Sequence, residues 1–183
     1  MKKIVLAVVM ILVFSVSVSF AETYEEWLST CKDYKDVAKW MKRNFLYDIG
    51  RSGRVWGPNT DPKDYPSRSP EETFKSKRGL CIDAAVFAKV SLNKINQEYK
   101  SEVIYLRANE QKFSVHYVAG FYEDGKMFVL DYGIPSGKSQ GGTWGPFENL
   151  DEYVKKVYLR WSEHREMKEY HLGWPEYRKF EKW

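Results

Sequence analysis

Cysteine and histidine are scarce in this chain of 183 residues, which has two of the first and three of the second. A zinc site needs three or four converging ligands, and His164 and His171 have no cysteine near them. We therefore predict no metal site. Two cysteines also allow only one disulfide, Cys31–Cys81, which an oxidising compartment would favour.

A strong excess of charge of one sign is absent as well. The chain has 29 basic and 25 acidic residues, and the basic residues are interspersed with acidic ones. Such a mild and scattered charge argues against a nucleic-acid partner. The glycine-rich stretch GKSQGGTWG lacks both the strand–loop–helix context and the Gly-Lys-Ser/Thr spacing of a phosphate-binding loop. We predict no cofactor.

The apolar run at the start of the chain is too short for a good membrane-spanning helix. Two lysines precede the apolar stretch 4–13, and Ser19 and Ala21 occupy the small-residue positions of a cleavage site before Glu22. This pattern predicts a secretory signal peptide over residues 1–21. The protein would then be exported, periplasmic or extracellular, without stable membrane insertion after cleavage. An uncleaved membrane anchor is the alternative.

Cleavage would leave residues 22–183, enough for a single domain with a sizeable core. Aromatic residues are abundant in it, and the chain has 7 Trp and 13 Tyr. Because this is more than a small core usually needs, some are expected to line a groove or surface. Four tryptophans lie in predicted loops or near predicted helix ends, where they could stack on a ligand: Trp56, Trp144, Trp161 and Trp174.

The segment that starts at Thr23 is predicted to form an amphipathic helix. Glu26 follows Thr23 at the spacing of a capping box, and apolar residues then recur at helical spacing as far as Met41. Cys31 lies within that apolar face, where a core role is expected. Residues 46–68 have no helical or strand period and are predicted to form a long irregular segment.

Two more helices are predicted in the middle of the chain. Ser69 caps a short one that has Pro70 in its first position, and Gly79 is expected to end it. Residues 81–95 form the second. Its alanines and its nearly continuous apolar content predict a central, buried helix.

The pattern changes to strands after Lys100. Three segments, 102–108, 112–122 and 126–133, have strand character, and the last two flank an Asp-Gly pair that favours a tight hairpin. A glycine-rich loop then leads to a helical region from Asn149. Helices combined with antiparallel strands predict an α+β fold.

Cys81 opens the buried helix directly after the turn at Gly79. Unpaired backbone N–H groups and the positive end of the helix dipole favour a thiolate at such a position. The same N–H groups are suited to stabilise an oxyanion. The pattern therefore predicts a nucleophilic cysteine, and a buried, inert cysteine is the alternative.

The hairpin register predicts a pairing of His116 with Asp131. If Asp124 and Gly125 form a two-residue turn, the two side chains become diagonal neighbours on one face, roughly 7–8 Å apart at the backbone. That face is the less hydrophobic one, and an aspartate there can orient an imidazole. The alternatives are a strand histidine satisfied by a nearby acid and an aspartate that caps the turn at Gly133.

The segment SPEETFKSKRGLCIDAAVFAKVSL, followed by HYVAGFY and VLDYG, resembles the transglutaminase-like superfamily. Within it, the likeness is to bacterial transglutaminase-like cysteine proteinases, and it covers residues 65–133. The resemblance implies a papain-related core in which the helix with the cysteine packs on the antiparallel sheet. It also implies that Cys81 is the nucleophile, that His116 is the general base and acid, and that Asp131 orients His116.

Two other residues fall at positions familiar from that family. Asp83 matches an acidic position of the bacterial proteinases, some of which bind calcium nearby. Ala84 and Ala85 offer no second carboxylate here, so we interpret Asp83 as a favourable acid in the first helical turn. Trp56 matches an aromatic residue that many relatives place beside the substrate, and a plain packing role is the alternative.

These observations predict a cysteine-dependent amide hydrolase, a peptidase or amidase, or an acyl transferase, with a peptide or protein substrate. Water as the second acceptor gives hydrolysis, and an amine gives transamidation. The rival hypothesis is a non-catalytic transglutaminase-like binding module with an aromatic-lined cleft for a peptide or glycan. A Cys31–Cys81 disulfide would favour the rival, because it would consume the nucleophile.

Overall fold

The computed structural model describes residues 22–55, 67–107, 115–133, 141–158 and 169–172. Its centre is a five-stranded antiparallel sheet in the order β6-β5-β4-β3-β7. The strands are β3 (Glu102–Arg107), β4 (Val115–Glu123), β5 (Lys126–Asp131), β6 (Gly142–Phe147) and β7 (Glu169–Leu172). The predicted signal peptide, His164, and Trp56, Trp161 and Trp174 lie outside the described residues.

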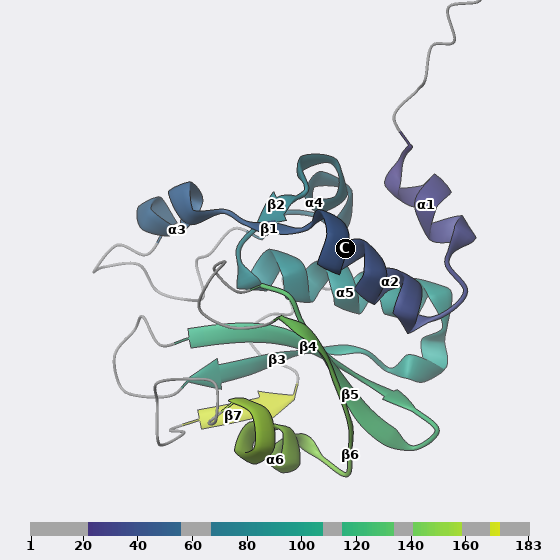
Figure 1. Cartoon of the computed structure of the whole chain (residues 1–183), viewed down its shortest axis with the longest axis vertical. Coiled ribbons are helices and arrows are strands. Elements are labelled where there is room, and N and C mark those ends of the chain that lie inside the picture. Colours follow the sequence, from purple (N-terminus) through teal and green to yellow (C-terminus); the bar gives the residue numbers. More distant parts are fainter. Residues whose placement is uncertain (1–21, 56–66, 108–114, 134–140, 159–168, 173–183) are drawn as a thin grey trace, which may run out of the picture.

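Helices cover both faces of the sheet, as Figure 1 shows. One face carries α5 (Cys81–Ile95), packed against α1 (Tyr24–Thr30), α2 (Tyr34–Asn44) and α4 (Pro70–Ser76). The other carries α6 (Leu150–Tyr153) and the π-helical turn η3 (Val154–Tyr158). The remaining elements are β1 (Leu46–Tyr47), α3 (Ile49–Val55), β2 (Arg78–Gly79) and η2 (Gln97–Tyr99). This arrangement confirms the predicted α+β class with a central helix on an antiparallel sheet.

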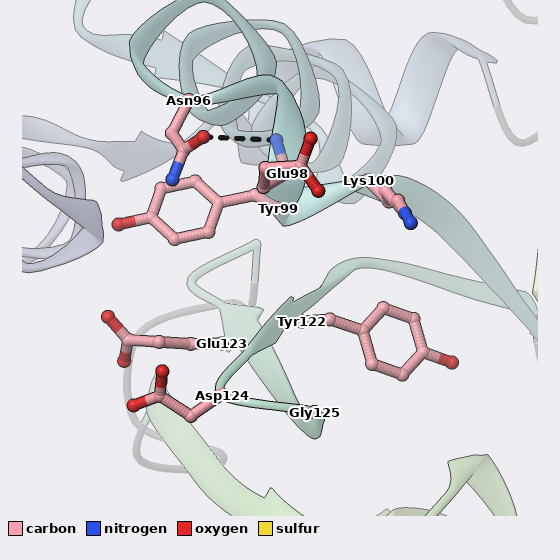
Figure 2. A pocket seen from close by; sticks show the side chains of 8 residues that line it. All are labelled: Asn96, Glu98, Tyr99, Lys100, Tyr122, Glu123, Asp124 and Gly125. Atoms are coloured by element: carbon pink, nitrogen blue, oxygen red, sulfur yellow. Dashed lines mark hydrogen bonds between the residues drawn. The ribbon is translucent and has the colours of Figure 1, made fainter.

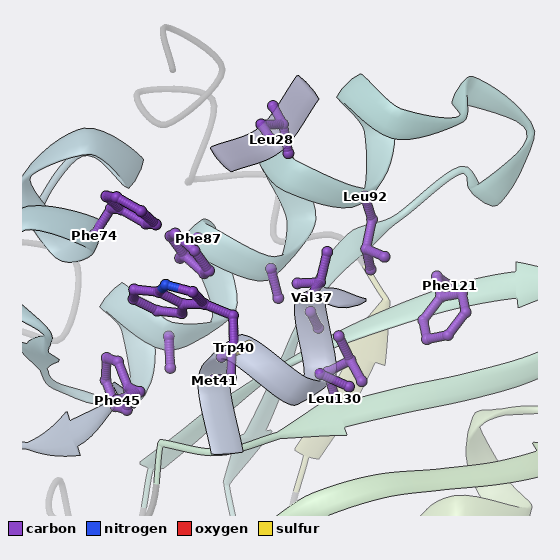
Figure 3. Packing of buried hydrophobic residues seen from close by; sticks show 14 of the residues in the cluster. Leu28, Val37, Trp40, Met41, Phe45, Phe74, Phe87, Leu92, Phe121 and Leu130 are labelled. Carbon is purple, nitrogen blue, oxygen red and sulfur yellow. The ribbon is translucent and has the colours of Figure 1, made fainter. Parts of the chain in front are cut away.

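The core on the α5 side is built largely from aromatic rings. Phe87 of α5 is fully buried, and the rings of Trp27 and Trp40 stack on it with centroid distances of 5.6 and 4.6 Å. Phe74 stacks on Trp40 at 5.0 Å, as Figure 3 shows. Each such pair contributes about 0.5–1.5 kcal/mol beyond the area that it buries. Many of the abundant aromatic residues therefore pack the core, whereas the sequence suggested a ligand groove for the surplus.

The opposite face of the sheet is buried as well. Val118, Met127 and Val129 point toward α6 and η3, where they pack against Tyr153 and Val154. The sequence predicted this face to be the less hydrophobic one, and it is the face of His116 and Asp131. It is nevertheless a second core, because the short helical region after Asn149 folds back over it.

The hairpin between β4 and β5 has the predicted register. Glu123 pairs with Lys126 and Ala119 with Leu130. The turn residues Asp124 and Gly125 both have positive φ, 51° and 73°, which is the backbone of a type I′ turn. Its twist matches that of the strands, so the Asp-Gly pair sets which residues of the two strands share a face.

The first predicted helix is two helices. The capping box of Thr23 and Glu26 is present, but α1 ends at Thr30 and α2 begins at Tyr34. The side chain of Asp33 accepts a hydrogen bond from the N–H of Lys35 at 2.8 Å and caps α2. This cap starts a second helix. The apolar spacing continues through the break and therefore did not indicate it.

Two segments predicted to be irregular contain regular structure. Helix α3 and strand β1 lie within 46–68, and Asp48 caps α3 through a hydrogen bond from the N–H of Arg51 at 3.0 Å. Strand β6 occupies the end of the predicted glycine-rich loop. Both were missed because short elements carry too little periodicity, and β6 depends on pairing with β5.

Gly79 does not end α4 as predicted. The helix stops at Ser76, and Lys77 takes the left-handed conformation with φ 52°. Gly79 lies in β2 instead, where a Cβ atom would come within 2.6 Å of the Cβ of Asp83. The glycine is needed for a close approach to α5 rather than for a helix stop.

Another glycine lets the end of the hairpin meet the start of α5. A Cβ atom on Gly133 would lie 2.4 Å from the Cα of Cys81, a distance that real Cβ atoms do not reach. Because the obstructing atom is backbone, no side-chain rotation relieves the clash. The absence of a side chain at this position therefore sets how closely the end of the hairpin approaches Cys81.

We expect Gly133→Ala to lower the free energy of unfolding by about 1–3 kcal/mol, because overpacking forces the backbone to shift. Urea unfolding followed by circular dichroism measures this. Gly50→Ala is the matched control, since a Cβ atom there would have only Asp48 Oδ1 at 3.8 Å as a neighbour. Equal stabilities of the two variants would contradict the close approach.

Candidate active site

Cys81 is the first residue of α5 and follows β2 after a single residue. It is 3% exposed. Its sulfur lies in the first helical turn, where the helix dipole is positive and backbone N–H groups have no partner within the helix. This is the local environment that the sequence predicted for the nucleophile.

His116 and Asp131 form a hydrogen-bonded pair. Nε2 of His116 lies 2.9 Å from Oδ1 of Asp131, and the two side chains are 16% and 8% exposed. The hairpin register puts them on the same face of neighbouring strands, as the numbering of the turn predicted. A hydrogen-bonded carboxylate holds an imidazole in one orientation and favours its charged form.

The thiol of Cys81 completes the set. It lies close enough to His116 to raise the pKa of that ring through hydrogen bonding and charge. Since Nε2 faces Asp131, Nδ1 is the ring nitrogen left for the sulfur. The structure thus brings together the three residues predicted as catalytic, from α5, β4 and β5.

These neighbours determine the charge of His116. Burial by itself lowers the pKa of an imidazole, because it disfavours the charged form. The charge of Asp131 and its hydrogen bond, together with the hydrogen bond and charge of Cys81, outweigh burial and raise the pKa of His116 to about 10. At neutral pH the ring is therefore an imidazolium between two groups that stabilise it.

Tyr153 is a neighbour of this set that the sequence did not indicate. It belongs to α6, is completely buried, and its hydroxyl lies 3.4 Å from Oδ2 of Asp131. No motif or spacing connects a tyrosine in a short terminal helix with an aspartate 22 residues earlier. Only the packing of α6 against the sheet brings the two together.

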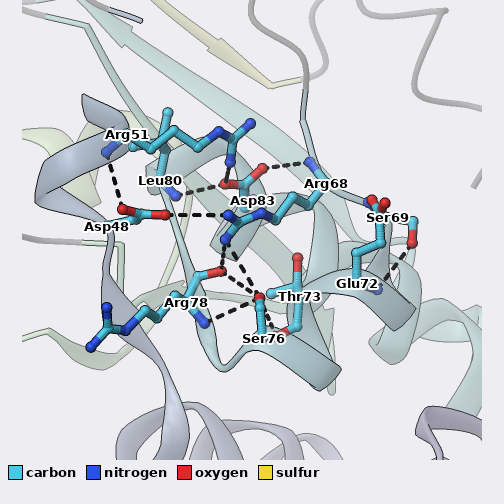
Figure 4. Close-up of polar contacts among 10 residues, drawn as sticks. All are labelled: Asp48, Arg51, Arg68, Ser69, Glu72, Thr73, Ser76, Arg78, Leu80 and Asp83. Carbon is cyan, nitrogen blue, oxygen red and sulfur yellow. Dashed lines mark hydrogen bonds and ion pairs between the residues drawn. The ribbon is translucent and has the colours of Figure 1, made fainter. Parts of the chain in front are cut away.

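Asp83, in the first turn of α5, is the centre of a second polar cluster, which Figure 4 shows. It is completely buried. Its Oδ2 accepts from the N–H of Leu80 at 2.7 Å and from the guanidinium of Arg51. Its Oδ1 accepts from the N–H of Arg68 at 2.6 Å. The bond to Leu80 confirms the predicted first-turn role, whereas the two arginine contacts were missed.

Burial raises the pKa of Asp83, and the donors from Arg68, Leu80 and Arg51 oppose that effect. The guanidinium of Arg68 extends the cluster by donating to Asp48 Oδ2 at 3.3 Å. The chain on both sides of residues 56–66 is thereby tied to the helical turn that begins at Cys81.

The predicted alternative of a disulfide is contradicted, because both cysteines are free. Cys31 lies at the end of α1, half-buried, and its thiol donates to the carbonyl of Trp27 at 3.6 Å. Burial, followed by the charges of Asp36, Glu22 and Asp33, raises the pKa of Cys31 to about 11. Cys31 therefore behaves as a protonated core residue, as predicted.

Trp144, predicted to lie in a loop and to stack on a ligand, lies in β6. It is half-buried and packs against the hydrophobic cluster under α6. His171 belongs to β7, which pairs with β3. Within the ranges that the structure describes, no three or more His, Cys, Asp or Glu side chains group in a way that could hold a metal ion. In the same ranges, no helix has the length and apolar character needed to cross a membrane.

A surface pocket lies away from Cys81, at the turn end of the β4–β5 hairpin (Figure 2). Its lining comes from η2 and from the hairpin turn: Asn96, Glu98, Tyr99, Lys100, Tyr122, Glu123, Asp124 and Gly125. Glu123 is seven positions beyond His116 along the extended strand β4, which corresponds to roughly 23 Å. The pocket therefore does not belong to the Cys81 site.

Comparison with protein families identifies the relationship of the chain. A family model for the transglutaminase-like domain matches residues 15–159. The chain belongs to the transglutaminase-like family. The resemblance predicted from the motifs around Cys81, His116 and Asp131 is thereby confirmed.

Individual relatives are distant. Over 99 residues, 53% of this chain, it is 26% identical to the UPF0252 protein MJ1282 of Methanocaldococcus jannaschii, and the match covers 28% of that protein. A crystal structure of a TGase superposes with a TM-score of 0.43 at 16% identity, over 65% of this chain and 29% of the TGase. LapG of Legionella pneumophila superposes with a TM-score of 0.38 at 15% identity, over 70% of this chain and 77% of LapG.

This transglutaminase-like chain thus spans less than a third of its curated relative and of the TGase. Because the TM-scores lie below 0.5, the fold assignment rests on the family match and on the topology of the sheet.

We expect Asp83→Ala to lower the free energy of unfolding by about 3–5 kcal/mol, because the largely buried guanidinium of Arg51 would lose the buried carboxylate that it binds. Urea unfolding tests this. Glu25→Ala is the control, since it breaks the exposed ion pair with Lys94 and should cost at most about 1 kcal/mol. A loss for Asp83→Ala no greater than that of the control would mean that the cluster has no structural role.

The charge of His116 also predicts a pH dependence. Its pKa in the folded protein, about 10, is above the ordinary value of 6.5, so protonation stabilises the fold. The stabilisation should be complete below about pH 6.5 and disappear as the pH rises toward 10. The measurement is the difference in unfolding free energy between the wild type and His116→Gln. A difference that grows with pH would mean that the folded state prefers a neutral ring.

Proposed function

We propose that this transglutaminase-like chain is a cysteine-dependent amide hydrolase, a peptidase or amidase, with Cys81 as nucleophile. His116 is the general acid and base, and Asp131 orients it. The observation that carries the proposal is the 2.9 Å hydrogen bond between His116 and Asp131, with Cys81 as a further neighbour that raises the pKa of His116. Two free cysteines also favour this function over a binding module, because the nucleophile is not consumed in a disulfide.

Acylation begins with the thiolate, which is the nucleophilic form of cysteine. In the reactive form the thiolate of Cys81 faces the imidazolium of His116, so attack needs no further proton transfer to the ring. The sulfur adds to the amide carbonyl, and backbone N–H groups at the start of α5, that of Cys81 among them, stabilise the oxyanion. Collapse breaks the C–N bond, His116 protonates the leaving amine, and a thioester remains.

Deacylation returns the enzyme to its starting state. His116, now neutral, removes a proton from water, and the hydroxide adds to the thioester carbonyl. The C–S bond breaks, the acid leaves, and the imidazolium again faces a thiolate. If an amine takes the place of water, the same steps form a new amide, which is transamidation.

The proposal includes a peptide or protein as substrate and export of the chain. Export is supported by the signal-peptide pattern of residues 1–21. N-terminal sequencing of the protein secreted by its host tests it, with Glu22 as the expected first residue. An N-terminus at Met1 in a membrane fraction would indicate an uncleaved anchor.

The test of the mechanism is alkylation by iodoacetamide with peptide mapping. At pH 7 we expect Cys81 to react at least about tenfold faster than Cys31, whose pKa is raised to about 11. His116→Ala should slow Cys81 and leave Cys31 unchanged. The same preparations are then assayed on fluorescein-labelled casein and a peptide-amide library, and Cys81→Ala is expected to abolish turnover, with Cys31→Ala as the matched control.

Equal, slow alkylation of both cysteines would mean that Cys81 is structural. Full hydrolysis by Cys81→Ala on every accepted amide would overturn the mechanism. Adding a fluorescent primary amine to the assay distinguishes the two reaction types, since hydrolysis leaves it free and transamidation incorporates it.

A further inference from the structure

Asp131 has a different partner on each of its two oxygens. Oδ1 faces Nε2 of His116 at 2.9 Å, and Oδ2 faces the hydroxyl of Tyr153 at 3.4 Å. Asp131 is 6% exposed, so solvent contributes little to its orientation. A carboxylate held at one oxygen only can rotate about its χ2 torsion, whose energy minimum is broad. A donor on the second oxygen restricts that rotation.

The position of Tyr153 is itself fixed by its surroundings. Asn149 caps α6 by accepting from the N–H of Glu152 at 3.1 Å, and the side chain of Glu152 accepts from the N–H of Glu148 at 2.7 Å. Glu148 pairs with Lys126, the first residue of β5, at 2.5 Å. Helix α6 is therefore tied to the strand that ends at Asp131.

Packing fixes the ring as the polar contacts fix the helix. The side chain of Tyr153 is completely buried, and its ring lies 5.7 Å from that of Phe147, in β6. A phenylalanine would satisfy these apolar contacts equally well. The hydroxyl is a polar group within a hydrophobic cluster, and the cost of burying it is offset only where it finds a hydrogen-bond partner.

We infer that Tyr153 is a positioning residue of the active site, whose hydroxyl holds the Asp131 carboxylate in the orientation that binds His116. The inference rests on the proposed function, since it assigns a role in the same site. In this role Tyr153 acts through Asp131 alone, and not on the sulfur or the imidazole directly.

The experiment compares the full chain with Tyr153→Phe and follows His116 by imidazole NMR during a pH titration. If the hydroxyl positions the carboxylate, its loss loosens the Nε2–Oδ1 bond, and the midpoint of His116 falls by about 0.5–1 pH unit. The lower end of that range is expected, because 3.4 Å is long for a hydroxyl bond. Alkylation of Cys81 should slow in parallel at pH values between the two midpoints.

Tyr24→Phe is the matched control. Tyr24 is buried, and its hydroxyl is paired with that of Ser91 at 3.0 Å. It belongs to the hydrophobic cluster around Phe87, whereas Tyr153 belongs to the cluster on the other face of the sheet. It should lose a similar amount of stability and leave the His116 midpoint unchanged. A midpoint that is unchanged in Tyr153→Phe, or higher because the carboxylate has lost a competing donor, would overturn the inference.

A double-mutant cycle with Asp131→Asn tests the route. When Tyr153→Phe is combined with Asp131→Asn, it should have no further effect on the His116 midpoint. A full effect in that combination would mean that Tyr153 acts on the ring by another path, which contradicts a positioning role through Asp131. If Tyr153→Phe does not fold, Tyr153→Met lacks the same hydroxyl, fills irregular space and takes its place.

The NMR readout separates this inference from the proposed function, because it needs no substrate. A lowered midpoint in a protein that hydrolyses no amide would retain the positioning role and reject the hydrolase. An active enzyme whose His116 titration ignores Tyr153 would reject the positioning role and retain the hydrolase.

Discussion

The contact on which the rest of this structure depends is the meeting of the first turn of α5 with the end of the β4–β5 hairpin. It is possible only because Gly133 has no side chain, since a Cβ atom would overlap the backbone of Cys81. At that contact a helix supplies the sulfur, while the hairpin supplies His116 and Asp131. Cys81, His116 and Asp131 therefore meet only when the helix packs on the hairpin, because neither element contains all three residues.

Two buried carboxylates flank that contact and have different partners. Asp83 is matched by the guanidinium of Arg51 and by backbone amides, so its charge is used to hold chain segments at the start of α5. Asp131 faces an imidazole and a phenol, and its charge keeps His116 protonated at neutral pH. The same functional group thus holds chain segments together in one place and sets the charge of His116 in the other, because its neighbours differ in charge and in their ability to exchange protons.

Most of what was predicted correctly came from local chemistry. The limits of α5, the capping boxes at Thr23 and Ser69 and the hairpin register all follow from contacts between residues close in sequence. The register then placed His116 beside Asp131, since a two-residue turn leaves no freedom in the pairing. The break between α1 and α2 was missed because the cap at Asp33 competes with an apolar spacing that continues through it. Some of the abundant aromatic residues were predicted to line a groove, because amino-acid composition does not distinguish a buried aromatic ring from an exposed one.

The sequence by itself determined the family, the α+β class and the identity of the three candidate catalytic residues, because short-range motifs and turn geometry carry that information. The tertiary structure alone decided which groups surround them. It brought Tyr153 to Asp131 and Arg51 to Asp83 across 22 and 32 residues. It also buried the sheet face that packs against α6, although the alternation of residues along the strands predicted this face to be the less hydrophobic one. The physical reason is that burial and hydrogen bonding between distant segments depend on how helices pack on the sheet, and no local pattern specifies that packing.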